Sequence, residues 1–109
     1  MPGGAQHGQE SLALTALRET GEELGIPLDS IEIVCRLSPL NVPVSDYCIN
    51  PFVAYQPAAP AFLPNPVEVA DVLEVSLTLL LTPSSRQIGC WRDPGFSGAR
   101  TVPIFNFHG

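Results

Sequence analysis

The apolar positions near the N-terminus predict one amphipathic helix. Residues 1–9 are rich in glycine and favour a loop, and helical periodicity then runs from about Glu10 to Leu24. Gly25 supplies the left-handed conformation that often ends a helix, and Pro27 cannot continue one. We expect the apolar stripe of this helix to face the core. The stripe consists of Ala13, Leu17, Thr20 and Leu24, with Ala16 beside it.

The rest of the chain alternates between strand patterns and turn-forming stretches. Pro51 interrupts one candidate strand and suggests a bulge or a sheet edge. Residues 56–66 form a connection rich in proline and alanine, and Leu77–Leu81 predicts a short helical turn ended by Pro83. An α/β fold follows from one helix among several strands. The candidate strands are Ile31–Leu37, Tyr47–Tyr55, Val72–Ser76 and Thr101–Phe107.

Length and composition fit a small, loop-rich domain. The chain has 109 residues, of which 45% are hydrophobic, with 12 prolines and 9 glycines. No repeat or low-complexity linker divides it, so we expect a single domain over residues 1–109. The longest apolar run, near Leu77–Leu81, is far too short to span a membrane, and no signal peptide pattern begins the chain. We therefore expect a soluble protein that is not exported and has no membrane partner.

Charge narrows the class of partner. The net charge is −6, and all five basic residues are arginine. Such a protein is poorly suited to bind the phosphate backbone of a nucleic acid, so we expect no nucleic-acid partner. An acidic protein that acts on an anionic substrate needs local positive charge, and a bound divalent metal ion commonly supplies it.

Isolated residues with reactive or aromatic side chains add little. Cys35, Cys48 and Cys90 form no CxxC pair, which argues against a disulfide framework or a zinc site and fits a reducing cytoplasm. Cys35 and Cys48 lie in apolar runs and are interpreted as small buried residues. Trp91 is interpreted as a packing residue. The two histidines, His7 and His108, are interpreted as loop or terminal residues.

Acidic residues cluster on the polar side of the predicted helix. Glu19, Glu22 and Glu23 occupy positions i, i+3 and i+4 and therefore share one arc of its surface. Like charges this close repel unless a multivalent cation neutralises them, and carboxylate oxygens favour Mg²⁺ or Mn²⁺. The alternative interpretation is a solvated acidic face without a ligand.

The spacing around these carboxylates resembles the signature of the Nudix hydrolases, GX5EX7REUXEEXGU, in which U is a bulky apolar residue. Every fixed letter is present at its expected spacing. The one departure is Thr20 at the first U position, where its hydroxyl can bond a carbonyl one turn earlier. The matching residues are Gly4, Glu10, Arg18, Glu19, Glu22, Glu23, Gly25 and Ile26.

The resemblance implies metal-dependent hydrolysis of a diphosphate linkage in a nucleoside diphosphate derivative. Glu19, Glu22 and Glu23 look like ligands of Mg²⁺ or Mn²⁺, with Glu22 and Glu23 also counted as catalytic. Arg18 looks like the partner that orients these carboxylates, because a guanidinium can bind a carboxylate with two parallel bonds. Glu10, at the start of the helix, can reach the metal through water, or it can simply be a charge that favours the helix start.

Two further features complete the implied site. Gly3 and Gly4 allow the backbone to approach the metal or phosphate closely. The general base in such enzymes is a carboxylate of the signature or a glutamate on a later loop, which here is Glu68. Its alternative interpretation is a solvated loop charge, and Asp71 and Glu74 are poorer candidates.

The segment Asn65–Leu81 resembles the coenzyme A diphosphatase branch, which implies coenzyme A or a related compound as the substrate. The family fold is an α/β/α sandwich with a mixed sheet, and this chain resembles only part of it. Strands before Gly3 and a helix after Thr101–Phe107 are expected to be missing, which would expose sheet edges and favour a homodimer. The competing hypothesis is a truncated, catalytically impaired module that binds or assembles.

Overall fold

The computed structural model describes residues 1–42, 45–92 and 98–106. Contacts within the chain divide it into two compact units, Met1–Val72 and Leu73–Gly109. Each unit is described by itself. The assignment of all 109 residues to a single domain remains a prediction.

The first unit contains the helix predicted by the apolar periodicity. Helix α1 spans Leu12–Leu24 and begins after Ser11, whose hydroxyl accepts a hydrogen bond from the Leu14 amide at 3.2 Å. At the other end, Gly25 adopts the left-handed conformation, with φ of 68°, and its amide donates to the Gly21 carbonyl. The predicted stop is therefore confirmed, and the helix begins two residues after Glu10. A 3-10 turn, η1 (Leu28–Ser30), follows it.

Two antiparallel strand pairs follow α1 in the first unit. Strand β1 (Glu32–Arg36) pairs with β4 (Phe52–Tyr55), and β2 (Leu40–Val42) pairs with β3 (Tyr47–Ile49). The predicted strand 47–55 is thus two strands with different partners, divided at Pro51, which has no amide hydrogen to donate. The bulge lies in the partner strand instead, where the register shifts between Ile33 and Cys35.

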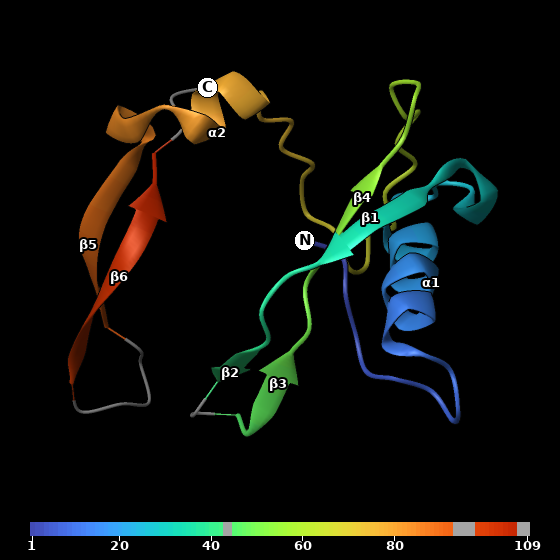
Figure 1. Cartoon of the computed structure of the whole chain (residues 1–109), viewed down its shortest axis with the longest axis horizontal. Helices are drawn as coiled ribbons and strands as arrows, with labels where there is room; N and C mark the ends of the chain where they lie inside the picture. Colours follow the sequence, from blue (N-terminus) through green and yellow to red (C-terminus); the bar gives the residue numbers. More distant parts are fainter. Residues whose placement is uncertain (43–44, 93–97, 107–109) are drawn as a thin grey trace. The chain divides into compact units, whose positions relative to one another are not determined.

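Helix α1 lies beside the β1–β4 pair (Figure 1), with a groove of about 630 Å³ between them. Leu17 and Thr20 of the predicted apolar stripe line this groove, together with Thr15, Ile33 and Phe52. The stripe is half-buried, and Ile26 is the one buried apolar residue in the described part of the chain. The polar side of α1 is thereby free to carry the carboxylates.

The second unit contains a short helix and a hairpin. Helix α2 spans Leu77–Leu81, as predicted, and is followed by the 3-10 turn η2 (Pro83–Ser85). Strand β5 (Arg86–Arg92) pairs antiparallel with β6 (Ala99–Phe105), so the predicted last strand begins and ends two residues earlier than expected. Its last predicted residue, Phe107, and the nearby His108 lie outside the described residues.

Three predictions about the elements and side chains are wrong. Residues 72–76 form no strand but an irregular segment, in which the Val72 amide bonds the side chain of Asp71 and Ser76 caps α2. Cys35 on β1 and Cys48 on β3 are exposed rather than buried. Trp91 is 60% exposed on β5 and does not pack in a core.

The fold class is compatible with the predicted α/β mixture of helices and strands. Every strand pair among the described residues is antiparallel, in three two-stranded sheets, so the mixed sheet of an α/β/α sandwich stays a prediction. In the same part of the chain, neither helix has the length and apolar character needed to cross a membrane.

Candidate active site

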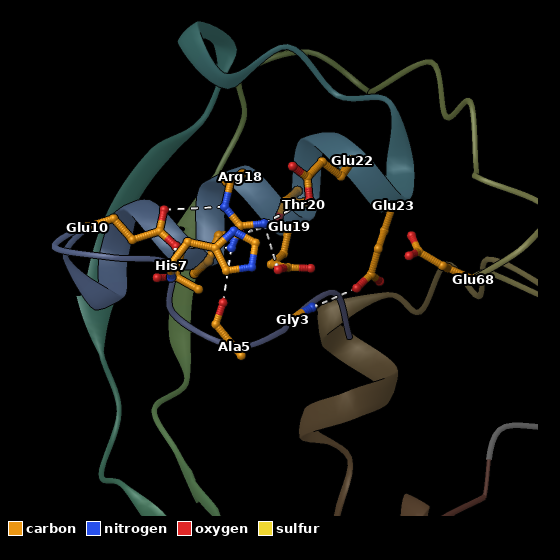
Figure 2. Close-up of polar contacts among 12 residues, drawn as sticks. Gly3, Ala5, His7, Glu10, Arg18, Glu19, Thr20, Glu22, Glu23 and Glu68 are labelled. Atoms are coloured by element: carbon orange, nitrogen blue, oxygen red, sulfur yellow. Dashed lines mark hydrogen bonds and ion pairs between the residues drawn. The ribbon is translucent and has the colours of Figure 1, made fainter.

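Arg18 is the centre of the polar network on α1. Figure 2 shows its guanidinium among the side chains of three glutamates. Nη1 donates to Glu19 Oε1 and to Glu22 Oε2, both at 2.8 Å, while Nε and Nη2 donate to the two carboxylate oxygens of Glu10 at 3.3 and 3.0 Å. Nη2 also donates to the Ala5 carbonyl at 3.1 Å. All the donor nitrogens of the planar fork are thus used, which an ammonium group could not reproduce.

Glu10 is held by this network just before the helix. Its carboxylate receives the two bonds from Arg18 and a third, of 2.7 Å, from the His7 amide. These bonds favour the ionised form, so the pKa of Glu10 falls from 4.5 to about 2, chiefly through the hydrogen bond from Arg18 and then through that from His7. The same partnership raises the pKa of Arg18. Glu10 therefore remains charged and tied to Arg18, while Ser11 caps the helix.

The N-terminal loop approaches the helix at the two predicted glycines. The Gly3 amide donates to Glu23 Oε1 at 3.1 Å, and a Cβ atom added at Gly4 would collide with the carboxylate of Glu19. A Cβ added at Gly3 would meet nothing within 4 Å. A side chain at position 4 would thus displace the Glu19 carboxylate from its place beside the backbone, whereas Gly3 contributes its amide hydrogen.

Glu68 lies in a turn that is attached to the C-terminal end of α1. The Leu63 amide donates to the Leu24 carbonyl at 2.9 Å, and the Asn65 amide donates to the Glu23 carbonyl at 2.8 Å. These bonds satisfy carbonyls that the last turn of a helix cannot pair within the helix. The Asn65 side chain then donates to Glu68 Oε2 at 3.1 Å, and Figure 2 shows the Glu68 side chain pointing toward Glu23.

Residues far apart in the sequence therefore meet at α1. The structure places Glu10, Arg18, Glu19 and Glu22 in one network, and it brings Gly3 and the turn of Glu68 to the opposite end of the acidic face beside Glu23. The hydroxyl of Thr20 bonds the Ala16 carbonyl at 2.7 Å, as predicted for this departure from the signature.

Comparison with known proteins agrees with the signature. The chain is 39% identical over 85 residues, 77% of its length, to an uncharacterized Nudix hydrolase NudL of Photorhabdus laumondii. It is 42% identical over 77 residues, 70% of its length, to proteins of the same name from Yersinia pestis and Yersinia pseudotuberculosis. The chain is a relative of the Nudix hydrolases.

The relation is partial in extent. The matched region spans 45% of the Photorhabdus protein and 38% of the Yersinia pestis protein, so the chain spans less than half the length of these Nudix relatives. No protein-family model matches the chain. The matches support membership of the Nudix family at this partial coverage.

The residue types at the Nudix signature fit a hard divalent cation, although the side chains are turned to other partners. The four carboxylates of Glu10, Glu19, Glu22 and Glu23 are bound by one guanidinium and two backbone amides, which leaves an excess of three negative charges. Across residues 1–42, 45–92 and 98–106, no three carboxylate, imidazole or thiol groups converge on one point that could hold a metal ion. Glu19 and Glu22 would have to turn from Arg18, and Glu23 from Gly3, to meet around an ion.

The sequence interpretation missed two residues that shape this candidate site. Ser11 caps α1, and its position directly before the periodic apolar run is a recognisable helix-start signal. The Asn65 side chain donates to Glu68 and accepts from the Val67 amide. The sequence signal for this turn is the pair Asn65-Pro66, since an Asn-Pro pair favours a turn. Its contact with the Glu23 carbonyl joins residues 42 positions apart (65 − 23), which no local pattern reveals.

Proposed function

We propose that this chain is the catalytic part of a Nudix hydrolase that splits a diphosphate linkage with Mg²⁺ or Mn²⁺. The observation that carries the proposal is the geometry of Arg18, which binds three of the carboxylates of the signature at once. A solvated acidic face would leave such side chains pointing separately into water. The similarity to Nudix hydrolases over 77% of the chain supports the same reaction class.

Each residue of the site has a role in the proposed reaction. Glu19, Glu22 and Glu23 would hold the ion, with Glu10 behind them. When bound there, the ion would supply positive charge against the phosphate oxygens and would make water a stronger acid. Arg18 fixes the rotamers of the glutamates, and the Gly4 backbone leaves room beside Glu19. We assign Glu68 as the general base, which takes the proton of the attacking water while the bond from phosphorus to the bridging oxygen breaks.

The proposed substrate is coenzyme A. The support is the segment Asn65–Leu81, NPVEVADVLEVSLTLLL, which resembles the coenzyme A diphosphatase branch. Water adds across the diphosphate, and the products are 3′,5′-ADP and 4′-phosphopantetheine. Glu68 belongs to this segment, and its turn is bonded to the end of α1. The segment that resembles the coenzyme A diphosphatase branch would therefore also carry the general base.

Product chromatography tests this function directly. The purified protein is incubated with coenzyme A, with ADP-ribose and with nucleoside triphosphates, each with and without Mg²⁺ or Mn²⁺. We expect metal-dependent release of 3′,5′-ADP from coenzyme A and no release with Glu23→Gln. Rapid turnover of ADP-ribose or triphosphates with coenzyme A intact would place the protein in another branch. Metal binding without hydrolysis of any of them would favour the binding or assembly module.

A further inference from the structure

Asn65 connects the helix that carries the acidic cluster to the loop that carries Glu68. Its backbone amide donates to the Glu23 carbonyl at 2.8 Å, and its side-chain Nδ2 donates to Glu68 Oε2 at 3.1 Å. The backbone carbonyl of Asn65 also accepts from the amides of Glu68, at 3.1 Å, and Val69, at 2.8 Å. One residue thus joins the last turn of α1 to both the backbone and the carboxylate of Glu68.

The orientation of the Asn65 amide is set by a second bond. Its Oδ1 accepts from the Val67 amide at 3.1 Å, which closes a turn of the kind that asparagine favours. Because Oδ1 must face this donor, Nδ2 is the atom that faces Glu68. The side chain of Asn65 is therefore fixed at both ends before any ligand binds.

Glu68 needs such a partner because it is exposed. An exposed glutamate samples many rotamers, and a general base acts efficiently only when it is held within reach of its proton. In Figure 2 the Glu68 carboxylate is turned toward Glu23. It accepts a hydrogen bond from the side-chain amide of Asn65. A neutral donor can hold the carboxylate without cancelling its charge.

We propose that Asn65 is a positioning residue that orients the Glu68 carboxylate toward the Glu23 end of α1 for proton abstraction. The proposal rests on the proposed function, in which Glu68 is the general base. Asn65 itself touches neither substrate nor water in the reaction. Its contribution should therefore appear in kcat and should require Glu68.

Two substitutions at Asn65 separate this role from that of the turn. Asn65→Asp keeps an oxygen for the Val67 amide but removes the donor to Glu68, whereas Asn65→Ala removes both. We expect both to lower kcat by about 10-fold to 10²-fold with KM and metal affinity unchanged, since small misplacements of a reacting group cost this much. The backbone bond to Glu23 is kept in both. Asn50→Asp is the matched control, because it removes a side-chain amide donor whose acceptor is the Cys48 carbonyl and not Glu68, and it should leave kcat unchanged.

A double-mutant cycle supplies the deciding measurement. In the Glu68→Gln background, Asn65→Asp should cause no further loss of kcat, because the residue acts through Glu68. The hydrogen bond is also read without turnover, as a shift of the Asn65 side-chain amide signals in the nuclear magnetic resonance spectrum of Glu68→Ala. Glu74→Ala should leave these signals in place.

The outcomes distinguish this proposal from the proposed function. If the wild-type protein hydrolyses coenzyme A and Glu23→Gln does not, but Asn65→Asp retains normal kcat, the positioning role is overturned alone. Additive losses in the double variant overturn it as well. A wild-type protein that hydrolyses no diphosphate overturns the proposed function and the role of Asn65 with it.

Discussion

The two ends of the acidic face of α1 are built from the same residue type and held in opposite ways. Glu10, Glu19 and Glu22 share the guanidinium of Arg18, with contacts of 2.8 to 3.0 Å. Glu23 and Glu68 instead accept bonds of 3.1 Å from neutral groups, the Gly3 amide and the Asn65 side chain. An ion pair compensates the charge of its carboxylate, while a neutral donor orients a carboxylate and leaves its charge available.

This difference suggests a division of labour within the site. At the Arg18 end, hydrogen bonds join the helix to the N-terminal loop, from Arg18 to the Ala5 carbonyl and from the His7 amide to Glu10. We call this network of Arg18, its three glutamates and the loop the frame. The Glu23 end carries the negative charge that would attract a cation and accept a proton. We therefore expect the largest loss of turnover for a substitution at Glu23. Substitutions in the frame, at the Arg18 end, should cause smaller losses of turnover, and at Glu10 a change in acid stability.

The largest effect is expected for Glu23→Gln. The loss of the Glu23 carboxylate should lower kcat by about 10²- to 10⁴-fold and change KM far less, because the lost interaction stabilises charge that develops in the transition state. Steady-state kinetics with coenzyme A measure both constants, and circular dichroism checks that the variant is folded. A near-normal kcat would remove Glu23 from the reaction.

Arg18→Lys should have the next largest effect. Lysine keeps the positive charge but cannot donate to Glu10, Glu19 and Glu22 with one planar group. We expect a loss of about 10- to 10²-fold in kcat, as for other residues that orient metal ligands. Equal kinetics for lysine and arginine would show that charge alone matters at this end.

Two alanine substitutions in the N-terminal loop test how closely the backbone approaches the Glu19 carboxylate. Gly4→Ala places a Cβ against the Glu19 carboxylate, which must shift from its bond to Arg18, whereas Gly3→Ala meets nothing within 4 Å. We expect kcat to fall on the order of 10-fold for Gly4→Ala, since a displaced ligand is a small misplacement of the site. Gly3→Ala keeps the amide that bonds Glu23 and is the control. The same kinetics for both variants would contradict the close approach at Gly4.

The smallest effect is expected for Glu10→Gln and concerns acid stability. The pKa of Glu10 in the folded protein is lowered from 4.5 to about 2, so its ion pair stabilises the fold above pH 4.5 and this contribution is lost as the pH falls toward about 2. Glu10→Gln should therefore lose less stability than the wild type across that window. Urea unfolding at a series of pH values measures this. The exposed Glu74, changed to Gln, should keep the wild-type slope, and an unchanged slope in Glu10→Gln would contradict the assignment.

The sequence predicted the local features of this site and missed the long-range ones. The spacing of Arg18, Glu19, Glu22 and Glu23 on a helix, and its end at Gly25, follow from periodicity and backbone conformation, and the structure has them. The attachment of residues 63–65 to the last turn of α1 depends on tertiary contacts, and a stretch rich in proline and alanine carries no pattern for them.

Strand prediction failed for related reasons. The run 72–76 has β-branched residues, but Ser76 serves as a helix cap, which competes with strand formation. Strand β5 was missed because Gly89 and two terminal arginines break its apolar pattern. The strand forms by pairing with β6, which lies later in the chain. Local propensity could not decide either case, since the partner of each segment lies elsewhere in the chain.

Titration calorimetry with Mn²⁺ tests most directly whether the acidic face of α1 is a metal centre. The wild-type protein is compared with the double variant Glu22→Gln/Glu23→Gln, and with Glu74→Gln as a control of equal charge change per site. We predict that the double variant loses metal affinity by at least about 10-fold, since each lost carboxylate removes a hard, charged ligand. The control should bind as the wild type does. Unchanged affinity in the double variant would contradict the assignment of this helix as the catalytic centre.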